Sequence, residues 1–140
     1  MTHSIQLDHN LGVVVLRYSG IVDFEEIRNV FDELVQIPSF REGLSLVADF
    51  RNSDTPLTAD EVRKLANYAL RTDGKWGATK WALIASKDRT FGLARMYLAL
   101  TADYQVTTHV FRSAQDADNW LGLGVEMEEI LARASPAGKT

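Results

Sequence analysis

The side chains best suited to bind a ligand are polar or basic residues that follow the apolar, strand-like stretches of the chain. Such side chains can hold a phosphate, a carboxylate or an acidic patch of a partner, because nearby helix N-termini add unpaired N–H groups and a partial positive charge. The same residues can also serve only as helix caps and solvated surface charges. The candidate ligand-binding residues at this predicted sheet edge are Asp49, Arg51, Thr58, Lys87, Arg89 and Arg112.

Asp49 differs from the other candidates, because it interrupts the apolar run at residues 44–50. That run predicts a strand that is covered on both faces. Asp49 caps no evident helix, so a buried Asp49 needs a partner such as Arg51 or a loop N–H.

Catalytic and metal-binding motifs are missing from the sequence. It contains no Gly-x-Ser-x-Gly elbow, no Gly-rich phosphate loop and no cysteine, which excludes Cys nucleophiles and thiolate metal sites. His3, His9 and His109 lack the spacing of metal ligands, and we interpret them as structural, with His3 and His9 at the surface. We therefore expect a protein that is not an enzyme, with no catalytic residue, no metal and no cofactor.

The composition is that of an ordinary globular domain. The 140 residues fit one domain, and a net charge of −4 argues against nucleic acid as a partner. The first residues lack the pattern of a signal peptide, and no apolar stretch has the length of a membrane span. We expect a cytoplasmic protein without a membrane span.

The hydrophobic periodicity predicts the element order ββαβαβαβα. Strands are expected at residues 4–7, 11–18, 44–50, 79–85 and 106–111, and helices at about 23–37, 59–72 (ended by Gly74), 89–102 (capped by Asp88), 114–121 and 125–134. A short connection at 8–10 predicts an antiparallel hairpin, and the intervening helices predict parallel strands afterwards. We predict a three-layer α/β/α domain with a mostly parallel five-stranded sheet and an N-terminal antiparallel strand. The domain spans 1–134, including the C-terminal amphipathic segment 125–134, and a flexible tail follows at 135–140.

The helix predicted at 89–102 is unusual, because apolar side chains point all round it and Arg95 is the one charge within FGLARMYLALTA. Such helices are normally covered on more than one side. The surplus face can meet a second subunit, a bound apolar ligand or the C-terminal segment. The predicted apolar interface or pocket consists of Phe91, Met96, Tyr97, Leu98 and Leu100.

Four stretches of the chain resemble the SpoIIAA-like group of STAS-related domains, a group that is similar to the CRAL-TRIO lipid-binding fold. They are SGIVDFEEIRNVF, LSLVADFR, TKWALIAS and VFRSAQDADNWL, within residues 4–121. The resemblance implies a non-enzymatic domain that binds a protein partner or a small ligand. In the anti-sigma-factor antagonists of the STAS group, a serine at the start of the second helix is phosphorylated. Thr58 lies nearest that position, with Ser53 and Thr55 beside it, but SDTPLTADE lacks the Asp-Ser-Ser-Gly motif, which argues against this switch.

Two functions follow from these features. The first is a STAS-like interaction or regulatory domain that binds a protein partner and self-associates as a homodimer through the third helix. The second is a small carrier or sensor of an apolar or amphiphilic anionic, lipid-like ligand, held by the third helix and the basic sheet edge.

Overall fold

The computed structural model describes residues 2–133, which form a five-stranded sheet with the strand order β1-β2-β3-β4-β5. The strands are β1 (His3–Asp8), β2 (Val13–Ile21), β3 (Ser45–Asp54), β4 (Thr79–Ile84) and β5 (Val106–Phe111). β1 pairs antiparallel with β2, and all later neighbours pair in parallel. The predicted mostly parallel sheet with an antiparallel N-terminal strand is confirmed. The predicted tail at 135–140 and the last residue of the 125–134 segment lie outside the described residues.

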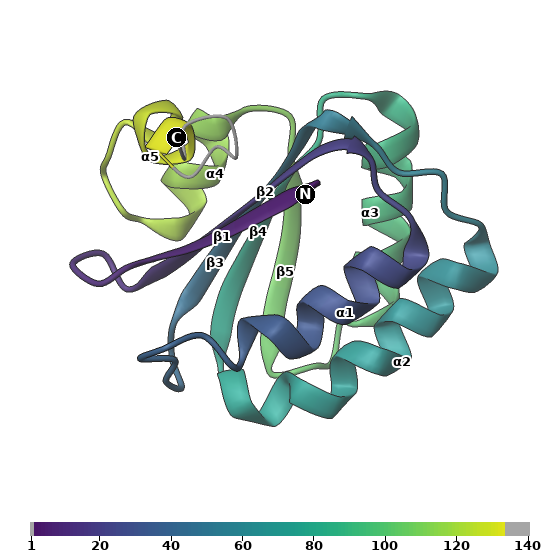
Figure 1. The fold of residues 1–140 in the computed structure, drawn as a ribbon, viewed down its shortest axis with the longest axis horizontal. Helices are drawn as coiled ribbons and strands as arrows, with labels where there is room; N and C mark the ends of the chain where they lie inside the picture. The colour runs from purple at the N-terminus through teal and green to yellow at the C-terminus, as the bar shows by residue number, and fades with distance from the viewer. Residues whose placement is uncertain (1, 134–140) are drawn as a thin grey trace.

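The helices form a layer on each side of the sheet, as predicted. The helices are α1 (Phe24–Leu34), α2 (Ala59–Trp76), α3 (Asp88–Leu100), α4 (Ala114–Leu121) and α5 (Met127–Arg133). Figure 1 shows α1, α2 and α3 on one face and α4 and α5 on the other. Each of the first three helices joins two strands that are neighbours in the sheet, so connections of one hand put all three on the same face.

Two hydrophobic cores lie on the two faces of the sheet, because successive strand residues point to opposite sides. In β3, Leu46 and Ala48 belong to the core under α1, α2 and α3. Val47, between them, belongs to the smaller core under α4 and α5. The two helical layers therefore pack on the sheet through separate sets of side chains.

β3 is longer than the predicted strand at 44–50. Its pairing with β2 continues past an irregularity, joining Ser19 to Asn52, Gly20 to Ser53 and Ile21 to Asp54. The turn-forming side chains of residues 52–54 predicted a loop at these positions. Backbone pairing with β2 keeps them in the strand instead. The connection to α2 is confined to residues 55–58.

Helix boundaries follow the predicted caps in part. Asp23 accepts a hydrogen bond from the backbone N–H of Glu26, and Thr58 forms a complete capping box at the start of α2. The predicted stop at Gly74 is wrong, because α2 continues to Trp76 and ends at Gly77, whose φ of 73° suits glycine. Asp88 does not cap α3: it is the first helical residue, after an N-cap position without a side-chain hydrogen bond. No helix among residues 2–133 is long and apolar enough to cross a membrane.

Candidate functional site

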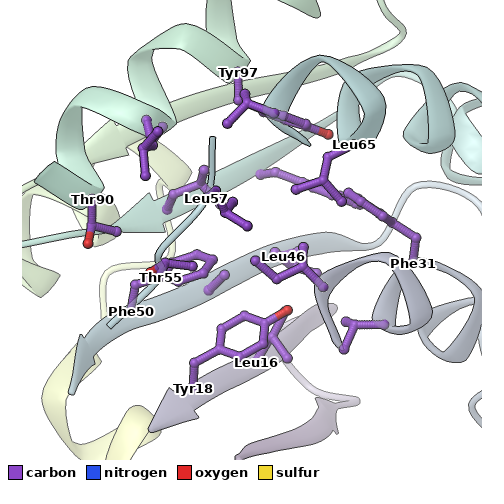
Figure 2. Close-up of a pocket in the computed structure, with 18 of the residues that line it drawn as sticks. Leu16, Tyr18, Phe31, Leu46, Phe50, Thr55, Leu57, Leu65, Thr90 and Tyr97 are labelled. Atoms are coloured by element: carbon purple, nitrogen blue, oxygen red, sulfur yellow. The ribbon is translucent and has the colours of Figure 1, made fainter. Parts of the chain in front are cut away.

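An apolar cavity of about 90 Å³ lies between the sheet and the layer formed by α1, α2 and α3. Its walls come from β2, β3, β4, the loop before α2 and all three helices (Figure 2). No charged side chain of the described residues lines it. Its apolar walls include Leu16, Phe31, Leu46, Leu57, Leu65 and Leu93.

Four of the lining residues carry a hydroxyl group, but the surface of the cavity itself is almost entirely apolar; they are Tyr18, Thr55, Thr90 and Tyr97. The Thr55 Oγ1 atom is buried without a hydrogen-bond partner. None of the other three hydroxyls donates or accepts a hydrogen bond with another residue in the described range 2–133. Burial raises the pKa of Tyr18 and of Tyr97, so both phenols remain neutral hydroxyls.

The residues that carry these hydroxyls come from three parts of the fold. Tyr18, on β2, stacks against Phe50 of β3 with ring centroids 4.7 Å apart. Thr55 follows β3 directly, and Thr90 lies in the first turn of α3. Figure 2 shows Thr55 and Thr90 at the same end of the cavity, beside Phe50. Small-molecule pockets are lined mostly by apolar side chains, and no paired nucleophile and base from residues 2–133 lines this one.

Helix α3 covers the cavity and contributes Thr90, Leu93, Ala94 and Tyr97 to its lining. Of the five residues predicted as an apolar interface or pocket, only Tyr97 lines the cavity. Phe91 lies instead under the guanidinium of Arg112, 4.0 Å from the ring centroid. The other three are Met96, Leu98 and Leu100, and Leu100 is 37% exposed.

The C-terminal segment does not cover α3. α5 lies on the opposite face of the sheet (Figure 1), where Met127, Ile130 and Leu131 pack into the core shared with α4. The amphipathic pattern predicted a helix correctly, but it carries no information on which face of the sheet the helix occupies. The predicted covering of α3 by this segment is therefore wrong. Covering of α3 by a second subunit or by a ligand stays a prediction.

Asp49 is buried on the α4–α5 face, where it meets the partner expected from the sequence. It accepts hydrogen bonds from the Arg51 backbone N–H at 3.0 Å and from the Arg51 guanidinium at 2.9 and 3.0 Å. Arg17 lies 3.5 Å away and also donates to the backbone carbonyl of Leu131 in α5. Arg51 bonds Glu128 of α5 as well, and these bonds, with Glu128 the larger influence, raise the pKa of Arg51. The cluster fastens α5 to the sheet.

The other basic candidates gather at the ends of β3, β4 and β5, away from Asp49. Lys87 bonds Asp54 at 2.8 Å and the carbonyl of Ser53 at 2.9 Å, and its hydrogen bond lowers the pKa of Asp54. Arg112 bonds Asp88 at 2.8 Å, and Arg89 is exposed. The six candidate ligand-binding residues therefore do not form one site, because alternation along β3 turns Asp49 and Arg51 toward α5.

His3 is less exposed than its position near the terminus suggested. Its side chain is 11% exposed, with Nδ1 2.6 Å from Glu26 and Nε2 3.0 Å from Glu33. The two glutamates lie two turns apart on α1, so His3 links β1 to that helix. His9 is exposed, as expected, and the ring of His109 packs at a steep angle against the Trp120 ring. No group of three potential metal ligands occurs among the described residues.

Comparison with known proteins identifies the architecture. No family model and no curated protein matches the sequence. A solved structure does match: an uncharacterised protein of the DUF3478 family with a SpoIIAA-like fold, from Shewanella loihica PV-4. The TM-score is 0.55 at 14% sequence identity, covering 85% of this chain and 93% of that chain. The chain has a SpoIIAA-like fold.

The three predicted phosphoacceptors occupy different environments in this SpoIIAA-like fold. Thr58 is exposed, and its hydroxyl accepts the N–H of Glu61 as the cap of α2. Ser53 is buried and donates to the carbonyl of Phe50, and Thr55 lines the cavity. Of the three, only Thr58 has the exposure that a kinase needs, and its phosphorylation stays a prediction.

Sequence reasoning did not single out Tyr18 and Thr90, two of the four hydroxyl-bearing residues that line the cavity. Tyr18 could have been found, because it shares a strand face with Val14 and Leu16 at a spacing of two residues. Thr90 has no such signal, because a threonine in the first turn of a helix is common. Thr55, the other threonine that lines the cavity, lies far away in the sequence.

Proposed function

We propose that this chain is a non-enzymatic binding domain that holds a small apolar molecule between the sheet and α3. The observation that carries the proposal is the cavity itself, an apolar space beside the buried, unpartnered hydroxyl of Thr55. Native interiors are packed at the density of organic crystals, and buried polar atoms are normally bonded. Both departures occur together here, at the centre of the larger core.

The size of the cavity limits the part of the ligand that is buried. Its volume of about 90 Å³ is below the roughly 150 Å³ of an engineered cavity that admits benzene. A short alkyl group fits this space, and a longer molecule reaches solvent at one end or displaces α3. Because every residue of α3 except Thr90 is half-buried or exposed, the helix can shift at small cost in buried apolar area.

The test is a titration with 1-hexanol and with hexane, followed by NMR of the leucine methyl groups. We expect concentration-dependent shifts at Leu46, Leu57 and Leu93, which line the cavity, and smaller shifts at Leu70, which is on the exposed side of α2. Native mass spectrometry after gentle purification should also show a co-purifying ligand. Absence of any cavity-specific methyl shift with both probes contradicts the proposal.

A matched pair of variants separates binding in the cavity from binding elsewhere on α3. Ala94→Leu fills the cavity from α3, whereas Ala99→Leu adds the same side chain at an exposed position of the same helix. We expect Ala94→Leu to abolish the methyl shifts and Ala99→Leu to retain them. Equal binding by both variants would place the probes outside the cavity.

A second candidate function, self-association through α3, rests on the apolar side chains that this helix leaves outside the cavity. Leu98 is half-buried and Leu100 is 37% exposed, and apolar side chains are enriched in the cores of homodimer interfaces. We expect light scattering to show a dimer that Leu98→Asp or Leu100→Asp dissociates, while Leu70→Asp on α2 leaves it intact. A monomer at high protein concentration excludes this function.

A further inference from the structure

We propose that the ligand is an amphiphilic carboxylate, with its alkyl chain in the cavity and its carboxylate outside the cavity, beside Arg89 and Lys87. This inference rests on the proposed binding function and specifies the chemistry of the ligand. It concerns the end of the cavity that Thr55 and Thr90 line, beside Phe50 (Figure 2).

Charged side chains gather next to this end of the cavity. Thr55 directly follows Asp54, the last residue of β3, and Thr90 directly follows Arg89 in the first turn of α3. The Nζ atom of Lys87 lies 2.8 Å from the carboxylate of Asp54. Arg89 is near enough to help lower the pKa of Asp54, after the larger effect of the Lys87 hydrogen bond. Both basic side chains therefore lie near Asp54, beside the two threonines.

Positive charge is in excess around this end of the cavity. Lys87 pairs with Asp54, and Arg112 pairs with Asp88. Arg89 is exposed and forms no ion pair with any other residue in the range 2–133. The start of α3 has no side-chain cap, so its first N–H groups add a partial positive charge. Arg89 is therefore available as the counter-charge of a bound anion.

The lining of the cavity admits the alkyl chain and excludes the carboxylate. The surface of the cavity is almost entirely apolar, and no charged side chain of residues 2–133 lines it. A carboxylate buried among these walls would lack a counter-charge, which is strongly unfavourable. A chain that leaves the cavity past Thr90 places its carboxylate next to Arg89 instead, where water and the basic side chains both stabilise the charge.

The experiment compares three probes with six-carbon chains, hexanoate, 1-hexanol and hexylammonium, by methyl NMR titration at pH 7 and low ionic strength. The methyl groups of Leu57 and Leu93 report binding, because both residues line the cavity. Wild-type protein should bind hexanoate about 2- to 5-fold more tightly than 1-hexanol, the range of an exposed ion pair. Hexylammonium should bind more weakly than both. Salt at about 0.5 M should remove most of the preference by screening.

Substitutions assign the preference to the basic side chains. Arg89→Gln should lower the affinity for hexanoate to that for 1-hexanol, while the affinity for 1-hexanol itself stays unchanged. Asp54→Asn should strengthen hexanoate binding, because it frees Lys87 from its ion pair. Arg95→Gln is the matched control, since Arg95 is an exposed arginine of the same helix that does not line the cavity. It should leave the affinity ratio of hexanoate to 1-hexanol unchanged.

The possible failures separate this inference from the binding function. Equal affinity of wild-type protein for hexanoate and 1-hexanol overturns the inference while the binding function stands. The same holds for a ratio that Arg89→Gln alters no more than Arg95→Gln does. Failure of all three probes to shift the cavity methyl groups overturns the binding function and this inference together.

Discussion

On the α4–α5 face of the sheet, the buried carboxylate of Asp49 accepts several hydrogen bonds, whereas on the α1–α3 face the buried hydroxyl of Thr55 has none. On the α4–α5 face, the charged side chains form ion pairs with one another. On the α1–α3 face, a cavity lies beside the hydroxyl of Thr55, which has no partner. The contrast separates a polar group that holds the fold together from a polar group that has no partner in the fold.

The largest loss of stability is expected from Asp49→Ala, which removes the buried carboxylate of the α4–α5 face. The change leaves Arg17 and Arg51 partly buried without their shared carboxylate. Removing one partner of a buried ion pair costs about 3–5 kcal/mol, and we expect a loss near the lower end, measured by urea denaturation. Asp54→Ala, which removes an exposed ion pair with Lys87, is the control and should change stability little. Equal losses of unfolding free energy in the two variants would show that the Asp49 ion pairs stabilise the fold no more than an exposed ion pair does.

The next prediction compares how tightly the two faces are packed, by placing an alanine-to-leucine substitution on each. Ala117 is 0% exposed in the core under α4 and α5, so Ala117→Leu should lower the free energy of unfolding by about 1–3 kcal/mol through overpacking. Ala94→Leu extends into the cavity under α3 and should raise it by about 0.5–2 kcal/mol. Chemical denaturation of both variants measures the difference, and effects of the same sign would contradict an open cavity.

The smallest effect concerns the outer end of the charge cluster. The hydrogen bond from Arg51 lowers the pKa of Glu128, whose ordinary value is 4.5. A lowered pKa in the folded state adds stability above the unfolded pKa, and this stability is lost as the pH falls through the folded pKa. Because Glu128 is 66% exposed, Glu128→Gln should cost less than about 1 kcal/mol at pH 7. The difference from wild type should shrink below about pH 4; a difference that stays constant with pH would assign the effect to packing.

The fold follows from local patterns, whereas the site does not. The alternation in β3 and the caps at Asp23 and Thr58 indicated the correct elements, since each depends on residues close in sequence. The burial of Asp49 and its pairing with Arg51 were also predictable, because an isolated carboxylate in an apolar strand needs a nearby donor. The cavity joins Tyr18, Thr55 and Tyr97, which come together only through the order of the strands, and no local pattern encodes an empty volume.

The strand order β1-β2-β3-β4-β5 has a consequence for how the chain assembles. Each strand after the first pairs with the strand that precedes it in the chain, so no pairing in the sheet joins distant parts of the sequence, which lowers its entropic cost. The lining of the cavity lies within residues 16–97. In contrast, the bond from Arg17 to the Leu131 carbonyl spans 114 residues. The sheet and the cavity therefore depend on pairings between successive elements, whereas the bonds that hold α5 to the sheet join segments that lie far apart in the sequence.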